Sequence, residues 1–234
     1  MERLDKIISH AFSLSRKQAK QAIQSGAVKI DGIVVKASDA KAEPSQVTLD
    51  EKIADYKEHI YIMMNKPQGV ISASEGGTQK TVVDLVPQAL RRKGLFPAGR
   101  LDKDTVGFVL ITDDGAFAHD ILSPKKHVEK TYFVQTDKPI PAELPDRFRQ
   151  GVVLYDGSVC MSAVLETDSA CTCTVKIKEG KYHQIKRMFR VNGLSVVYLK
   201  RTAIGGLALD ASLKEGECRE IGAQELALIR DEQG

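Results

Sequence analysis

Apolar residues near the start of the chain recur at the spacing of an amphipathic helix. One face of that helix carries four of them, Leu4, Ile7, Ile8 and Phe12. A second helix is predicted from Ser15, because Ser15-Arg16-Lys17-Gln18 has the form of a capping box and an apolar face follows it. Gly26 is expected to end this helix. The first quarter of the chain therefore begins with two short helices.

A hairpin is predicted directly after these helices. Asp31-Gly32 lies between the apolar segments 28–30 and 33–35, and this dipeptide favours a tight two-residue turn. A last strand is expected at 47–49, within a polar stretch that contains Pro44. Two helices and a hairpin form a small module with a thin core. We therefore expect an N-terminal module with its linker at residues 1–58 and a second domain at residues 59–234.

The second region has the periodicity of a sheet with helices between its strands. Strands are predicted at Ile60–Met64, Phe108–Thr112, Thr131–Thr136, Val152–Leu154, Val159–Leu165, Thr172–Ile177 and Leu194–Leu199. Helices are predicted at Ala116–Leu122, Ala142–Arg149, His183–Val191 and Ala223–Ile229. Many strands with scattered helices indicate an α+β domain with a largely antiparallel mixed sheet and flanking helices.

Composition narrows the class of protein. Of the 234 residues 42% are hydrophobic and 28% charged, as in soluble globular proteins. No apolar run is long enough to cross a bilayer, and Met1–Lys6 lacks the apolar core of a secretory signal. The four cysteines form no C-x-x-C pair. We therefore expect a cytoplasmic protein with reduced thiols, no metal site and no membrane partner.

The distribution of charge says more than the net charge of +3. Residues 1–36 contain seven basic and three acidic residues. Residues 176–201 contain eight basic residues, against Glu179 alone. Two basic blocks at opposite ends of the sequence suit a polyanion that contacts two surfaces, although either block alone could be a solvated helix face.

The most informative motif runs from Gly99 to Thr105. It places Arg100 and Asp102 two positions apart, directly before an apolar strand that ends at Asp113. A rigid strand of this kind can present one carboxylate beside one cation at the mouth of a cleft. An isolated Arg-x-Asp is more often a solvated turn, so the interpretation depends on the other motifs.

Four segments together resemble the pseudouridine synthases, which isomerise uridine within RNA. In chain order they are Asn65–Gly69, Arg100 with Asp102, Glu129–Tyr132 and Glu179–Met188. The resemblance is greatest to the RsuA-like branch, which acts on ribosomal RNA and carries a preceding S-four RNA-binding domain. His119, Ser123-Pro124 and His127 strengthen that assignment. Residues 3–49 resemble the S-four domain itself.

The resemblance implies a role for each site residue. Asp102 would be the essential residue, with Lys186 paired to it. Tyr132 and Ile185 would lie on the two sides of the flipped base, and the counterpart of Arg100 fills the space that the base leaves. The family more commonly has Arg where Lys186 stands, and lysine cannot grip a carboxylate with a bidentate fork.

Further residues are expected to contact RNA. In the S-four family, basic residues of the second helix meet phosphates, and here these are Arg16, Lys17 and Lys20. Arg187, next to Lys186, is expected to bind the substrate RNA. His183 is interpreted as positioning its loop or an RNA phosphate. The expected partner is ribosomal RNA or a ribosomal assembly intermediate, bound by a monomer.

The implied reaction explains the residue types. The uracil leaves C1′ of its ribose, turns and reattaches through C5, so the uridine must first be flipped out of its helix. Whether Asp102 attacks the sugar, attacks the ring or removes a sugar proton, it must be ionised. An isomerisation adds no group and involves no redox change, so no cofactor is expected.

Other functions fit parts of the sequence. A non-catalytic RNA-binding protein would need only the first module. Asp102-Lys103-Asp104-Thr105 also fits the nucleophile motif of haloacid-dehalogenase phosphotransferases, but there the first Asp follows an apolar strand, and here a loop precedes it. A retaining glycosidase would need two carboxylates facing one sugar, and Asp113-Asp114 is more simply a turn. Within the resemblance, small-subunit 16S RNA is favoured over large-subunit 23S RNA as the substrate.

Overall fold

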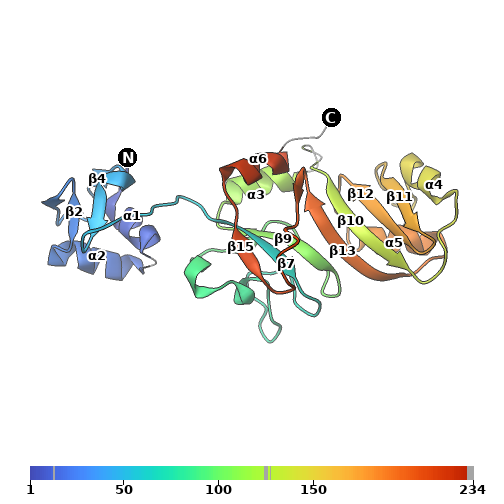
Figure 1. Ribbon diagram of the computed structural model, residues 1–234, viewed down its shortest axis with the longest axis horizontal. Coiled ribbons are helices and arrows are strands. Elements are labelled where there is room, and N and C mark those ends of the chain that lie inside the picture. The colour runs from blue at the N-terminus through green and yellow to red at the C-terminus, as the bar shows by residue number, and fades with distance from the viewer. Residues whose placement is uncertain (13, 124–125, 127, 231–234) are drawn as a thin grey trace. The chain divides into compact units, whose positions relative to one another are not determined.

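The computed structural model describes residues 1–12, 14–123, 126 and 128–230 (Figure 1). The chain divides into two compact units, Met1–Ile60 and Tyr61–Gly234. Both units combine helices with sheets, which confirms the α+β class. Within the described ranges, no helix has the length and apolar character needed to cross a membrane.

Two capped helices build the first unit. They are α1 (Leu4–Ala11) and α2 (Arg16–Ser25). The predicted capping box is confirmed, because Ser15 Oγ accepts from the Gln18 amide at 3.3 Å while the Gln18 side chain accepts from the Ser15 amide at 2.9 Å. Gly26 ends α2 in the left-handed region. The apolar faces of both helices are buried with the neighbouring strands, in a core of Leu4, Ile7, Ile8, Ala19, Ile23, Val28, Ala42, Val47 and Ala54.

A small antiparallel sheet completes this unit. Its strand order is β3-β2-β5-β6, formed by β2 (Val28–Ile30), β3 (Ile33–Val34), β5 (Val47–Leu49) and β6 (Lys52–Ile53). A separate pair joins β1 (Glu2–Arg3) to β4 (Lys41–Ala42), and a 3-10 turn spans Pro44–Gln46. The predicted hairpin is confirmed: Asp31 and Gly32 both have positive φ, at 47° and 78°, as its tight turn requires.

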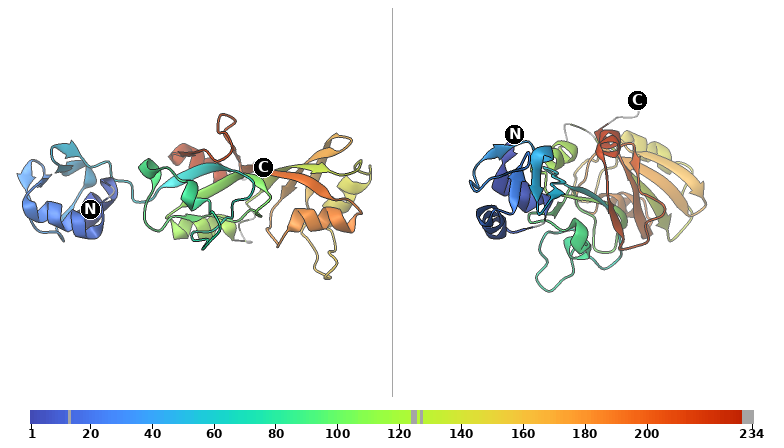
Figure 2. Two further views of the ribbon diagram at one scale, coloured as in Figure 1. Left: turned by 90° about the horizontal axis from the view of Figure 1, so that it is seen from below. Right: turned by 60° about the vertical axis from the view of Figure 1, so that its left-hand side comes forward.

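One mixed sheet forms the frame of the second unit (Figure 2). Its order is β11-β12-β10-β13-β9-β7-β15, with β14 beside β13 and β8 beside β9. The strands are β7 (Tyr61–Lys66), β8 (Phe96–Pro97), β9 (Val106–Thr112), β10 (Lys130–Thr136), β11 (Val164–Ser169), β12 (Thr172–Ile177), β13 (Val196–Ile204), β14 (Leu207–Ala208) and β15 (Cys218–Glu220). Among the pairings of the described strands, β13 with β9 is parallel and the others in this sheet are antiparallel.

Helices pack against both halves of this sheet. Those of the β7–β9 half are α3 (Gly115–Leu122) and α6 (Ala223–Arg230), which lie together in Figure 1 and share a core with Phe108 and Leu110. Those of the other half are α4 (Leu144–Gln150) and α5 (Gln184–Val191), joined by an edge contact between Phe148 and Phe189. Two 3-10 turns, Val83–Leu85 and Gln88–Leu90, lie between β7 and β8.

Gly107 allows the two halves of the sheet to meet. It lies opposite Arg201 in the parallel pairing of β9 with β13, and its φ is 98°. A Cβ at this position would approach the Arg201 carbonyl oxygen to 2.3 Å. Only glycine permits so close an approach, so this residue fixes the position of β9 next to β13.

Two strand predictions were wrong in whole or in part. The expected strand 152–154 and the first part of the expected strand 159–165 form only an isolated bridge between Val153 and Val159, and β11 includes the last two residues of the second one, because it begins at Val164. Val153 and Val159 are both exposed, so their side chains gain little from a longer ladder at this position. The predicted strand 194–199 is instead β13, which continues through Lys200 and Arg201 because both pair with neighbouring strands.

Candidate active site

The loop from Gly99 to Thr105 leads into β9, and hydrogen bonds from other segments fix its backbone. Ser72, which is buried, joins it at Leu101: the Ser72 hydroxyl donates to the Leu101 carbonyl at 3.1 Å and accepts from the Leu101 amide at 3.0 Å. The Gly69 amide donates to the Lys103 carbonyl at 2.8 Å. The loop is also closed on itself, because the Thr105 amide donates to the Asp102 carbonyl at 3.1 Å. These bonds give Asp102 a fixed backbone position.

Lys66 ties the same loop to β7. Its side chain is fully buried, and its amine donates to the carbonyls of Pro67, Lys103 and Thr105 at 3.1, 3.3 and 2.7 Å. Burial lowers the pKa of Lys66 to about 8. Asn65 and Lys66 of the Asn65–Gly69 motif belong to β7, and Lys66 supports the Asp102 loop.

Asp102 lies between two basic side chains, both supplied by the segment around α5. Lys186 Nζ is 3.0 Å from Asp102 Oδ2, and His183 Nε2 is 3.4 Å from Oδ1. Lys186 also donates to the Asp104 carboxylate. The Asp102 side chain is 27% exposed, so it is sheltered yet open to a substrate. One lysine therefore serves two carboxylates of the same loop.

In the cluster of Asp102, Asp104 and Lys186, the interactions between charges shift the pKa values of Lys186 and Asp104. Burial alone would lower the pKa of Lys186, but hydrogen bonds to Asp104 and Asp102 outweigh it and raise that pKa. The hydrogen bond from Lys186 in turn lowers the pKa of Asp104. Lys186 is thus held in its charged form near neutral pH, as the pairing with an ionised carboxylate requires.

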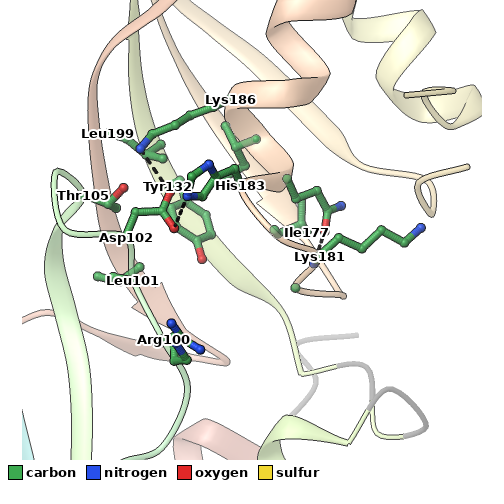
Figure 3. A pocket seen from close by; sticks show the side chains of 13 residues that line it. Arg100, Leu101, Asp102, Thr105, Tyr132, Ile177, Lys181, His183, Lys186 and Leu199 are labelled. Carbon is green, nitrogen blue, oxygen red and sulfur yellow. Dashed lines mark hydrogen bonds and ion pairs between the residues drawn. The ribbon is translucent and has the colours of Figure 1, made fainter. Parts of the chain in front are cut away.

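The pocket above Asp102 brings most of the predicted site residues together. Asp102, Lys186, Tyr132, Ile185 and Arg100 all line it. Figure 3 shows Arg100 and Lys186 at opposite ends, with Tyr132 behind Asp102. Tyr132 from β10 and Ile185 from α5 are buried walls, whereas Arg100 is exposed at the rim.

Four of the predicted RNA-binding residues lie outside this pocket. Arg187 does not line the pocket and forms an ion pair with Asp156. Arg16, Lys17 and Lys20 lie on α2 of the first unit, where all three are exposed. Pro124 and His127, which supported the branch assignment, lie outside the described residues.

The sequence reasoning missed two residues of the cluster. Asp104 was considered only as part of a phosphotransferase motif, although its spacing of two from Asp102 was a signal that both could face one cation. Lys66 gave no comparable signal, because a buried lysine looks like a surface lysine in a sequence. His183 was interpreted as a positioning residue, and the structure places its ring against Asp102.

Metal-ligating residue types do not gather in the part of the chain that the structure describes. Within it, no group of three or more His, Cys, Asp or Glu side chains could hold a metal ion. All four cysteines are free thiols, and burial raises the pKa of Cys173 to about 12. The pocket itself presents a carboxylate beside a lysine and a histidine, together with an aromatic and an aliphatic wall.

Comparison with known proteins agrees with this geometry. Residues 60–190 match the family model of RNA pseudouridylate synthases, and residues 2–44 match that of the S4 domain. The chain is 46% identical to an uncharacterized RNA pseudouridine synthase of Bacillus subtilis, over 99% of each sequence. It is 39% identical to the ribosomal small subunit pseudouridine synthase A of Escherichia coli, over 97% of this chain and 99% of that one.

A solved structure shows the same architecture. The crystal structure of a pseudouridylate synthase superposes with a TM-score of 0.70 at 37% identity, covering 98% of this chain and all of the other. The S4 model matches within the first compact unit, and the synthase model matches most of the second. The chain therefore belongs to the RNA pseudouridine synthases, isomerases of uridine in RNA, and to their RsuA-like branch with an N-terminal S4 domain.

Proposed function

We propose that the protein isomerises one uridine of small-subunit 16S ribosomal RNA and that Asp102 is the essential residue. The observation that supports this proposal most directly is the position of the Asp102 carboxylate, which interacts with Lys186 and His183. It lies in a pocket that Tyr132 and Ile185 also line. The choice of RNA follows the Escherichia coli relative, whose name assigns it to the ribosomal small subunit.

The proposed reaction breaks the bond between C1′ of the ribose and N1 of the uracil. The ring then turns, C5 bonds to C1′, the C5 proton is lost and N1 gains a proton, so the atoms balance without any added group. Attack on the sugar, attack on the ring and removal of a sugar proton all need an ionised Asp102. The Lys186 ammonium lies 3.0 Å from this carboxylate and would pair with its negative charge.

The walls of the pocket suit a flipped uracil. Tyr132 offers an aromatic face for stacking, and Ile185 offers an apolar surface from the other element. Unstacking a uridine from its helix costs a few kcal/mol, so contacts of this kind are needed to hold the base. Arg100 lines the rim of the pocket, and we infer that it occupies the gap that the base leaves in the RNA.

The first unit is proposed to carry part of the RNA affinity. Arg16, Lys17 and Lys20 are exposed on α2, which is anchored in the core of the unit by the buried Ala19 and Ile23. Their charges are thus free to meet phosphates, which supply a large share of affinity in protein–RNA complexes. A protein that only binds RNA would not need the Asp102 pocket, so the pocket favours an enzyme over this alternative.

A phosphotransferase is not supported by the surroundings of Asp102. In that class the first Asp follows a parallel strand, whereas β8, which precedes Asp102, runs antiparallel to β9. The residue that would be the second acid, Asp104, is bound to Lys186. The surroundings of Asp102 therefore favour a carboxylate paired with a lysine over the nucleophile of a magnesium-dependent phosphotransferase.

The decisive experiment maps pseudouridines in ribosomal RNA from cells with and without this protein. We expect one site in 16S RNA to lose its modification, and the purified protein to restore it on that RNA. If the modification is lost from 23S RNA instead, the proposed substrate is wrong but the proposed activity still holds. Unchanged modification in both RNAs, together with no product from the purified protein on either, would contradict the proposed function.

A further inference from the structure

Tyr182 is an aromatic side chain that the proposed reaction does not use. It lies directly before α5, next in sequence to His183 of the pocket, and is 76% exposed. Its ring stacks on the His183 ring with centroids 3.8 Å apart and planes 19° apart. One face of the tyrosine is thus supported by His183, while most of its surface remains in water.

The turn that carries this pair is tightly fixed. His183 has a φ of 47°, a left-handed conformation that a residue with a side chain seldom adopts. The Lys181 amide donates to the Gln184 side chain at 2.9 Å, and that side chain donates to Glu179 at 2.8 Å. Arg187 donates to the Tyr182 carbonyl at 3.3 Å. The two rings are therefore presented by a defined backbone.

The stack is connected to the reaction centre. His183 Nε2 lies 3.4 Å from Asp102 Oδ1, so Tyr182, His183 and Asp102 follow one another in space. Figure 3 shows the His183 ring beside Asp102 at the edge of the pocket. A planar group laid on the outer face of Tyr182 would extend the stack next to a nucleotide bound over Asp102.

The segment that carries the stack is rich in basic residues, of which Lys181, Lys186 and Arg187 form ion pairs with nearby acids. Between residues 178 and 190 there are five basic residues and one acid; the basic ones are Lys178, Lys181, Lys186, Arg187 and Arg190. A rigid exposed aromatic ring among cations is the arrangement by which proteins bind single-stranded nucleic acid, stacking on bases and pairing with phosphates. Tyr155, 79% exposed on the neighbouring turn, has no such stacked ring among the aromatic contacts of the described residues.

We propose that Tyr182, supported by His183, is the stacking platform for the base of a nucleotide adjacent to the target uridine. This inference rests on the proposed function, because it assumes an RNA substrate in the Asp102 pocket. It assigns a binding residue for unpaired RNA that flanks the reaction site. The flanking base and the flipped uridine are then held on two sides of His183.

The first test measures steady-state kinetics on 16S RNA for Tyr182→Ala, Tyr182→Phe and the matched control Tyr155→Ala. Tyr182→Ala should lower kcat/KM about 5- to 100-fold, mostly through KM, as expected when one base stack is removed. Tyr182→Phe should rescue the affinity, because it keeps the ring. Tyr155→Ala should stay near wild type. An unaffected Tyr182→Ala enzyme, or an equal loss in Tyr155→Ala or Tyr182→Phe, would overturn the platform.

The second test measures stacking on Tyr182 by fluorescence, in a protein that is expected not to turn over its substrate. A short single-stranded RNA with 2-aminopurine beside a central uridine is bound to the Asp102→Asn protein, with and without Tyr182→Ala. The fluorescence should be quenched on binding only when Tyr182 is present, and quenching by both proteins would contradict the proposal. Quenching that depends on Tyr182, together with no pseudouridine made by the wild type, would refute the proposed function and retain the platform.

Discussion

Lys186 and Asp102 are 84 positions apart in the sequence, and the Lys186 ammonium donates to the Asp102 carboxylate at 3.0 Å. The same ammonium donates to Asp104. Arginine would offer a planar fork to one carboxylate, whereas lysine has three donors on a compact charge and can bridge two acids. In this protein the single lysine therefore bridges two acids of the same loop.

Replacing Lys186 tests this pairing. Lys186→Met would leave two facing carboxylates in a partly buried loop without their cation, so we expect the rate to fall by about tenfold or more. Lys186→Arg keeps the charge and should remain within about threefold of the wild-type rate. Single-turnover rates at saturating RNA separate this effect from RNA binding.

A normal rate for Lys186→Met would show that Asp102 does not need this partner. Arg187 could not replace it without movement, because its guanidinium is paired with Asp156. Thermal unfolding of both variants provides the control, since a misfolded Lys186→Met enzyme would lose activity for another reason.

Asp102→Asn should abolish product formation and leave RNA binding within about threefold. The amide keeps the shape of the carboxylate but lacks the negative charge that every route requires, so the expected loss is at least about 10³-fold. Tritium release from labelled RNA measures turnover, and filter binding measures affinity. Substantial turnover by this variant would refute the role of Asp102.

Tyr132 is expected to act through its ring. Tyr132→Phe keeps the wall of the pocket, whereas Tyr132→Ala removes a stacking contact of about 1–3 kcal/mol. The Ala variant should therefore be clearly less active than the Phe variant. Equal losses in both would mean that the hydroxyl carries the function and that stacking on Tyr132 is unimportant. Since Tyr132 is 8% exposed, the folding of the Ala variant is checked by its unfolding temperature.

Local signals predicted the parts of the fold that depend on few neighbouring residues. The capping box at Ser15 and the Asp31-Gly32 turn are satisfied within a few positions of the chain, and both are confirmed. The length of β13 was not predictable in this way. Lys200 and Arg201 interrupt its apolar pattern, and they belong to the strand only because β9 and β10 pair with them.

The residues of the site that belong to sequence motifs were predicted, and those that support them from elsewhere were not. Asp102, Tyr132 and Lys186 were identified through the resemblance, and the structure gathers them around one pocket. The support beneath them was missed, because a sequence does not show which backbone carbonyls will face a lysine. Lys66 meets three such carbonyls from two different segments. Tertiary contacts of this kind leave no periodicity to recognise.

The basic face of α2 is expected to bind phosphates. Changing Arg16, Lys17 and Lys20 together to Ala should weaken RNA binding and reduce the salt dependence of affinity by a slope of about 0.7–0.9 for each phosphate that is no longer neutralised. The turnover rate at saturating RNA should change little. The control is Lys52→Ala, an exposed lysine of β6 in the same unit. A salt slope equal to that of the wild type would show that this face is only solvated.

Lys66 should make stability depend on pH in the alkaline range. In the folded protein burial lowers its pKa to about 8, whereas the unfolded chain retains the ordinary value of 10.5. Between these two values the unfolded state binds more protons, so the free energy of unfolding rises with pH because of this residue, by at most about 1.4 kcal/mol per pH unit. Below about pH 8 both states are protonated and the dependence disappears.

Lys66→Met removes this contribution and the three hydrogen bonds beneath the Asp102 loop. Urea unfolding of both proteins should therefore give a wild-type minus mutant difference that is constant below about pH 8 and grows between about pH 8 and 10. Lys103→Met, an exposed lysine in the same loop, should show no such growth. A difference for Lys66→Met that stays flat across the alkaline range would mean that its amine remains charged in the folded protein, stabilised by the carbonyls of Pro67, Lys103 and Thr105.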